Sequence, residues 1–251
     1  MQLPHGPPNV PDVLGAAFPA RLACDVRSVL AVLPDARLGP VEPFQVEVQG
    51  EVVAIPSRIY NEEPEAGLEP SLTGTQRLIL HCLYSRHGDG RVRQRRLERI
   101  VSSSEPWVVP FVVQLAGEYV LEILETIGRG LPGLAVPGSA QRRLYGEFIA
   151  RNAVFFARTE RRVASYWSCY YRGKYAAFGT YPGGALVEGF RAAASEQVGA
   201  RLPRHTPSPS ANAASGQRPA TSGPVISVRQ TNCWTSGSND GSAGDLLEVA
   251  D

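Results

Sequence analysis

The helical spacing of apolar residues between positions 72 and 171 constrains the fold of this chain most strongly. Apolar side chains recur there three and four residues apart, which is the pattern of amphipathic α-helices. Thr73 followed by Gln76 has the spacing of a capping box and predicts a helix that continues to Tyr84. Successive amphipathic helices must bury their apolar faces against one another. The sequence therefore predicts a mainly α fold, a multi-helix bundle.

A long, strongly apolar helix is predicted over residues 105–127, with Ser104 as its cap. Pro110 is expected to kink its first turn. Because nearly all sides of this segment are apolar, we expect it to lie at the centre of the core. The other helices of this bundle are predicted over residues 91–102, 139–149, 153–172 and 184–198.

Residues 44–56 change from a helical to an alternating period. Val46 and Val48 alternate with polar residues, Gly50 follows, and a second apolar run ends at Pro56. This pattern predicts a small β-hairpin that turns at residues 49–51. An isolated hairpin is only marginally stable, so we expect it to pack on the helices.

Composition divides the chain into three parts. Residues 1–43 are predicted to be an N-terminal segment with one helix over residues 20–33. Residues 44–200 are predicted to form the helical domain, including the β-hairpin 44–56. Residues 201–251 are rich in Ser, Pro, Gly, Ala, Thr and Asn, and their scattered apolar residues bury too little surface to offset chain entropy. We predict that this last part is a disordered tail.

Charge and hydropathy narrow the class of protein. The formal net charge is +1, so no global field draws the chain to nucleic acid or membrane. No apolar run approaches the roughly 18 residues of a transmembrane helix. The first residues have neither the basic start nor the apolar run of a signal peptide. We therefore expect a cytoplasmic protein without a membrane partner.

The four cysteines are Cys24, Cys82, Cys169 and Cys233. Their wide spacing gives neither a disulfide framework nor a zinc motif, and we predict no metal and no cofactor. We expect the first three to be small buried apolar residues. The chain has 24 arginines and one lysine, which is typical of a GC-rich genome. Arginine content alone therefore does not indicate phosphate binding.

The most basic segment is the predicted helix 91–102. It carries Arg91, Arg93, Arg95, Arg96 and Arg99. Such a helix can contact the phosphates of a nucleic acid, but only Gln94 is suited to base edges. The other interpretation is a solvated arginine face, partly neutralised by acidic residues of the helix 105–127, and most charge runs are of this kind.

Those acidic residues are Glu118, Glu122 and Glu125. Their spacing places them on one face of the predicted helix. A metal site would need histidine three residues after a glutamate, and there is none, so we expect a solvated outer face. His81 lacks an accompanying nucleophile and orienting acid, and we interpret it as a partly buried polar residue and not as a catalytic base.

An aromatic cluster lies at the end of the predicted helix 153–172. It consists of Tyr166, Trp167, Tyr170, Tyr171 and Tyr175. With arginines nearby it can act as a stacking platform for bases or another ligand. Its helical spacing instead favours packing in the core, with the tyrosine hydroxyls at a polar rim.

Two resemblances extend this reading. The run from Asp89 to Leu115 resembles one unit of a HEAT-type helical repeat, and only one such unit is visible. The stretch from Ile55 to Tyr171 resembles proteins of GC-rich, actinobacterial-type bacteria that carry no assigned activity. The second resemblance implies no catalytic residues.

The sequence leaves three function classes open. The favoured one is a non-catalytic cytoplasmic protein-interaction or scaffold protein. The alternative is a nucleic-acid-binding protein that uses the helix from Arg91 to Arg99. An enzyme ranks last, because no paired acid and base can be identified. An exposed apolar patch would favour a protein partner, and a continuous basic surface would favour nucleic acid.

Overall fold

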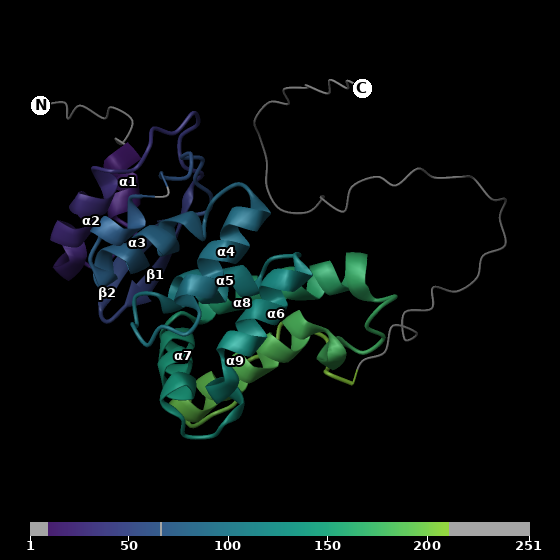
Figure 1. The fold of residues 1–251 in the computed structure, drawn as a ribbon. Helices are drawn as coiled ribbons and strands as arrows, with labels where there is room; N and C mark the ends of the chain where they lie inside the picture. Colours follow the sequence, from purple (N-terminus) through teal and green to yellow (C-terminus); the bar gives the residue numbers. More distant parts are fainter. Residues whose placement is uncertain (1–9, 66, 211–251) are drawn as a thin grey trace, which may run out of the picture. The chain divides into compact units, whose positions relative to one another are not determined.

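The computed structural model describes residues 10–65 and 67–210 of the chain (Figure 1). The regular structure of these residues consists of nine α-helices, four short 3₁₀ helices, one π-helical turn and one two-stranded sheet, β1 (Pro43–Val48) with β2 (Glu51–Pro56). The predicted mainly α fold with a small hairpin is confirmed. The helices are α1 (Val10–Gly15), α2 (Ala23–Leu30), α3 (Gly74–Tyr84), α4 (Gly90–Ile100), α5 (Val109–Ala116), α6 (Leu121–Gly130), α7 (Ala140–Arg151), α8 (Ala153–Tyr166) and α9 (Pro182–Val198).

The hairpin forms where its alternating pattern predicts. β1 and β2 are antiparallel, with Val48 opposite Glu51. Gln49 and Gly50 between them both have positive φ, 53° and 88°, which is the requirement of the tight turn that matches strand twist. One face of the hairpin is buried in the core, and it carries Val46, Val48, Val53 and Ile55.

The helix starts follow from short polar signals. The Thr73 hydroxyl accepts from the Gln76 amide, and the Gln76 side chain accepts from the Thr73 amide, so the predicted capping box of α3 is confirmed. The Asp89 carboxylate accepts a 2.7 Å hydrogen bond from the Arg91 amide and caps α4. The sequence analysis does not predict this capping role of Asp89, although Asp is a preferred N-cap residue.

The single long helix predicted over residues 105–127 is wrong. The chain forms two helices, α5 and α6, separated at residues 117–120. Val108 and not Ser104 is the N-cap of α5, and Pro110 lies in its first turn, where a missing N–H costs nothing. A Cβ on Gly117 would lie 3.3 Å from Cζ of Arg162, so the end of α5 packs closely against α8. Because of this break, the side chain of Glu118, the residue after Gly117, lies in the interior.

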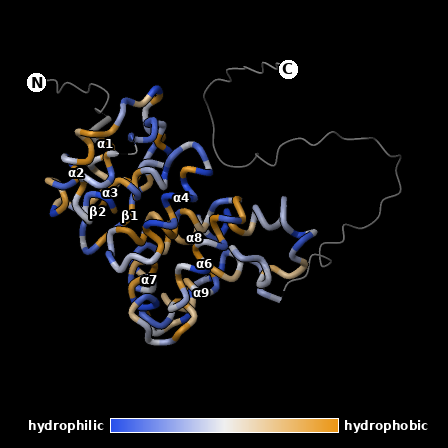
Figure 2. The backbone as a smooth tube through the Cα atoms, in the orientation of Figure 1, coloured by the Kyte–Doolittle hydropathy of each residue, from blue (hydrophilic) through white to orange (hydrophobic). Residues whose placement is uncertain are grey.

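The core is built by the apolar faces of the helices. Trp107, Leu115 and Trp167 are all buried, as the predicted stacking of helix on helix requires. The helices α7 and α9 approach so closely that a Cβ on Gly146 would lie 2.5 Å from the Ala193 carbonyl oxygen. In Figure 2 hydrophobic and hydrophilic residues alternate along the helices, as expected where each helix has one buried side.

The two ends of the described chain differ from expectation. The predicted helix 20–33 is a 3₁₀ turn followed by α2, and α1 precedes it. Residues 201–210, predicted to belong to a disordered tail, pack on the protein: the Gly179 amide donates to the Pro209 carbonyl at 2.9 Å, and Arg204 pairs with Glu188. The rest of the predicted tail, residues 211–251, lies outside the described residues.

The helix 153–172 is confirmed with a change of winding near its end. α8 continues as a π-helical turn over Trp167–Tyr171. None of the helices in residues 10–65 and 67–210 combines the length and hydrophobicity that crossing a membrane requires.

Candidate functional site

An open cleft of about 760 Å³ lies between the start of the hairpin and the start of α8. We call it the arginine cleft. Both of its walls come from segments far apart in sequence, which the Asn152 side chain holds together. It is lined by Glu42, Pro43, Phe44, Gln45, Ser57, Gln114, Arg151, Asn152, Ala153, Val154, Phe155, Arg158 and Arg162.

The arginine cleft is electropositive. Three of its lining residues are arginines and one, Glu42, is acidic. Arg151 pairs with Glu47 at 3.0 Å, but Arg158 is exposed and has no carboxylate within ion-pair distance among the described residues. The first amides of α8 have no side-chain cap and add the positive end of the helix dipole. The cleft therefore attracts an anionic group.

The Asn152 side chain forms hydrogen bonds with the free edge of β1 at the position where a neighbouring strand would pair with it. Its Oδ1 accepts from the Glu47 amide at 2.7 Å, and its Nδ2 donates to the Glu47 carbonyl at 2.9 Å. Main-chain groups alternate sides along an antiparallel strand, so Gln45 presents its N–H and C=O on the same edge as Glu47. The Ala54 amide, opposite Gln45, likewise points away from β1 and donates to Ala16. The edge at Gln45 thus opens into the arginine cleft.

A buried ionic cluster lies behind the cleft. We call it the Glu118 cluster; it consists of Glu118 with Arg58, Arg86, Arg93 and Arg162. Oε1 of Glu118 lies 2.8 Å from Nη2 of Arg58 and 3.9 Å from Nη2 of Arg162, and Oε2 lies 3.5 Å from Nη2 of Arg93. Burial alone would raise the pKa of Glu118, but the surrounding guanidinium charges hold it below its ordinary value. Glu118 is therefore a carboxylate at neutral pH.

The prediction that Glu118, Glu122 and Glu125 share one solvated face is wrong for the first of them. Glu122 and Glu125 lie exposed on α6, whereas Glu118 is 1% exposed. The reason is the break at Gly117, which removes the helical spacing between Glu118 and the other two.

The five arginines singled out in the sequence do not share one surface. Arg93 is buried and donates to the carbonyls of residues 87 and 88 as well as to Glu118. Arg95 and Arg96 pair with Glu63, and Arg96 also pairs with Glu69. Arg91 and Arg99 are exposed. The neutralising carboxylates Glu63 and Glu69 come from the segment before α3, whereas the predicted helix 105–127 supplies Glu118.

His81 is buried, more fully than the partly buried polar residue that the sequence predicts. Its Nδ1 lies 3.2 Å from Nη1 of Arg96, and its Nε2 lies 4.0 Å from Glu69. Burial lowers the pKa of His81 to about 4, so the ring is neutral at neutral pH. It does not line the arginine cleft.

The aromatic cluster is divided between core and surface. Trp167 is buried and donates to the Tyr175 carbonyl at 2.9 Å, so the core interpretation is right for this residue. Tyr170 is 65% exposed, so that interpretation is wrong for it. The rings of Tyr119, Tyr166 and Tyr170 lie 5.8–6.5 Å apart between centroids. Arg158, Arg162 and Tyr166 are spaced four residues apart on one side of α8, and Tyr170 follows in the π-helical turn.

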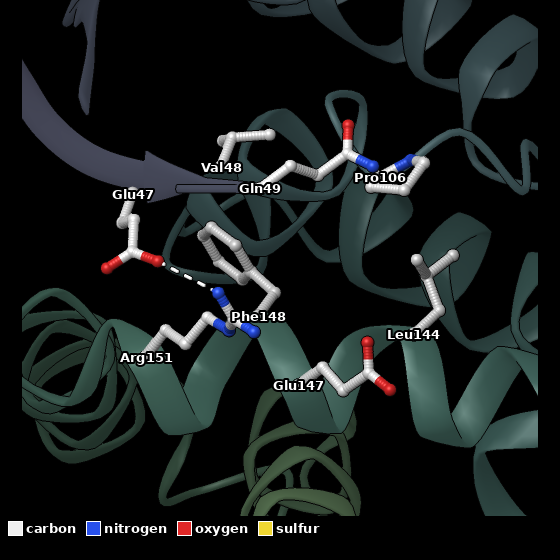
Figure 3. Close-up of a pocket in the computed structure, with 8 residues that line it drawn as sticks. All are labelled: Glu47, Val48, Gln49, Pro106, Leu144, Glu147, Phe148 and Arg151. Carbon is white, nitrogen blue, oxygen red and sulfur yellow. Dashed lines mark hydrogen bonds and ion pairs between the residues drawn. The ribbon is translucent and has the colours of Figure 1, made fainter. Parts of the chain in front are cut away.

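A smaller pocket of about 320 Å³ adjoins the arginine cleft, and the ion pair of Arg151 and Glu47 forms one side of it (Figure 3). Its other lining residues are mixed in character: Val48, Gln49, Pro106, Leu144, Glu147 and Phe148. The acidic Glu147 offsets the positive charge here, so an anion is favoured in the larger cleft and not in this pocket.

The cysteines are not uniformly buried. Cys82 lies in the core, as predicted, and burial raises the pKa of its thiol. Cys24 and Cys169 are exposed, so the prediction is wrong for both. Cys233 lies outside the described residues. Across residues 10–65 and 67–210, no three His, Cys, Asp or Glu residues come together as a metal site would need.

No protein-family model, no curated protein and no solved structure matches this chain. The resemblances to a HEAT-type unit and to proteins of GC-rich bacteria therefore stay predictions, and function rests on the geometry of the site.

Proposed function

We propose that this chain is a cytoplasmic, non-catalytic protein-interaction protein whose arginine cleft binds an extended, acidic segment of a protein partner. The observation that carries this proposal is the open strand edge at Gln45 beside unpaired arginine charge. A partner segment that lies along this edge can form main-chain hydrogen bonds, as strands do when they add to a sheet. Its acidic side chains then reach Arg158 and Arg162.

The apolar wall of the cleft supports the same ligand. Phe44 and Phe155 stack with centroids 5.2 Å apart, and Val154 beside them is exposed. Alternate side chains of an extended peptide point to opposite sides. One set can therefore contact this apolar wall while the other set pairs with the arginines, which is the arrangement that gives such sites their specificity.

The alternative function, nucleic-acid binding through the helix from Arg91 to Arg99, has less support. A phosphate-contacting helix needs several solvated arginines on one surface. In α4, Arg93 is buried, and both Arg95 and Arg96 are ion-paired with Glu63. A strand edge also offers little to a nucleic acid, whose backbone has no amide groups to pair with it.

Fluorescence anisotropy tests the proposal with a labelled peptide of alternating Glu and Val residues. We expect the wild type to bind it, with affinity falling as salt rises. Arg158→Glu should weaken binding about tenfold or more, because it reverses a charge in the cleft. Arg161→Glu is the matched control, since Arg161 is exposed on the same helix and does not line the cleft.

Two results would contradict the proposal. One is an equal loss of affinity in both variants, which would indicate a non-specific charge effect. The other is tighter binding of a single-stranded DNA probe than of the peptide, with loss in Arg91→Glu or Arg99→Glu, which would favour the alternative function.

A further inference from the structure

The Glu118 cluster contains more positive than negative charge. Four guanidinium groups surround one carboxylate, and arginine does not lose its proton in proteins. Two members are almost fully buried: Arg86 is 0% and Arg93 is 4% exposed. Charges that are buried in this way are usually paired. The cluster as it stands therefore lacks anionic partners.

Individual donors in the cluster are also unsatisfied. Nη1 of Arg86 and Nε of Arg93 are buried and have no hydrogen-bond partner among the described residues. The other groups of Arg86 donate only to main-chain carbonyls, those of Pro56 and Ser57. Buried donors without an acceptor are rare in native proteins, so these two donors indicate that the cluster can accept a further hydrogen-bonding partner.

The cluster and the arginine cleft are continuous. Ser57 and Arg162 both line the cleft. The Ser57 carbonyl accepts hydrogen bonds from Arg58 at 2.8 Å and from Arg86 at 2.7 Å. This carbonyl therefore links both arginines of the cluster to the wall of the cleft. The side chains of Arg58 and Arg162 are 26% and 33% exposed, and both reach Oε1 of Glu118. The two guanidinium groups therefore come together at Oε1 of Glu118, and of the two residues Arg162 lines the cleft.

We propose that the arginine cleft contains a phosphoryl-binding subsite at Arg162, next to Arg58, in which a phosphorylated side chain of the bound segment supplies the anionic charge that the Glu118 cluster lacks. This inference rests on the proposed function. A phosphoryl group brings about −1.5 to −2 charges and three acceptor oxygens, against one charge for a carboxylate. A guanidinium group such as that of Arg162 suits a phosphoryl group, because its planar fork can donate two parallel hydrogen bonds.

Calorimetry with four probes tests the subsite: inorganic phosphate, a peptide of alternating Glu and Val with one central phosphoserine, and the same peptide with Ser or Glu at that position. We expect the phosphoserine peptide to bind about tenfold more tightly than the Glu peptide. Inorganic phosphate should bind weakly and compete with it. These arms distinguish free phosphate from a phosphorylated segment as the source of the group.

Three variants locate the effect. Arg162→Gln should remove the preference for phosphoserine, while Arg161→Gln, outside the cleft, should keep it. Glu118→Gln removes the internal anion, so phosphate should raise its melting temperature more than that of the wild type. If Glu118 had only a structural role, phosphate would not raise the melting temperature of Glu118→Gln more than that of the wild type. This rise can be measured even if the variant is less stable.

The results that would contradict the subsite differ from those that would contradict the proposed function. Equal affinity for the phosphoserine and Glu peptides would overturn the subsite and leave the proposed function standing. Binding of inorganic phosphate that is lost in Arg162→Gln, with no peptide bound, would support the subsite and overturn the partner segment. A phosphoserine preference that persists in Arg162→Gln would overturn the placement of the subsite.

Discussion

Replacing Glu118 with glutamine tests how much the Glu118 cluster stabilises the fold. The carboxylate is 1% exposed and contacts three guanidinium groups. Removing one partner of a buried ion pair costs about 3–5 kcal/mol, since the opposite charge stays buried. Arg58 and Arg162 are partly exposed and regain water, whereas Arg93 does not. We therefore expect Glu118→Gln to lower the free energy of unfolding by about 3 kcal/mol at neutral pH.

The loss should depend on pH in a defined direction. The pKa of Glu118 is lower in the folded protein than in the unfolded chain. Its charge therefore stabilises the fold fully above the ordinary carboxyl pKa, and this stabilisation is lost as pH falls through the folded pKa. Glu118→Gln lacks this contribution at every pH, so the difference from the wild type should shrink in acid.

Urea unfolding at neutral and acidic pH measures both effects. Glu122→Gln is the control, because Glu122 is exposed on α6 and should change stability by less than about 0.5 kcal/mol. A loss in Glu118→Gln below about 1 kcal/mol would refute the reasoning, since it would mean that the buried arginines need no internal anion. A difference that does not change with pH would refute it as well.

Three further predictions concern other parts of the fold. Gly146→Ala should destabilise the protein by about 1–3 kcal/mol in urea unfolding, because the new Cβ would meet the backbone of Ala193 at 2.5 Å. Asn152→Ala should cost about 1–3 kcal/mol by the same assay, since both main-chain groups of Glu47 lose their partner, and it should also weaken peptide binding in the arginine cleft. His81→Asn should remove the part of the stability loss that the wild type shows as pH falls from about 6.5 toward 4, because the buried ring resists protonation while the unfolded chain accepts a proton.

Local features of the fold could be predicted because their causes lie within a few residues. The capping box of Thr73 and Gln76 and the tight turn at Gln49 and Gly50 depend on neighbours in sequence, and the structure confirms both. The sequence predicts one long helix over residues 105–127 because the apolar pattern continues across Gly117. A single glycine in a helical pattern costs only about 1 kcal/mol, so it does not by itself identify a break.

The candidate site could be predicted only in part. The spacing of Arg158, Arg162, Tyr166 and Tyr170 can be read directly from the sequence and points to one side of a helix. The role of Arg58 cannot, because its pairing with Glu118 joins residues that only the folded chain brings together. In the sequence, positive charge is densest from Arg91 to Arg99. This density does not reveal which of these arginines are neutralised by acidic residues from distant parts of the chain.

Amide NMR spectra recorded during titration with the alternating Glu and Val peptide test the central claim most directly. If the segment lies along the open edge of β1, the largest shifts should fall on Gln45 and on the amides of residues 153–158. The amides of α4 should move little. Shifts concentrated on residues 91–99, or no saturable shifts at all, would contradict the binding of an acidic segment in the arginine cleft.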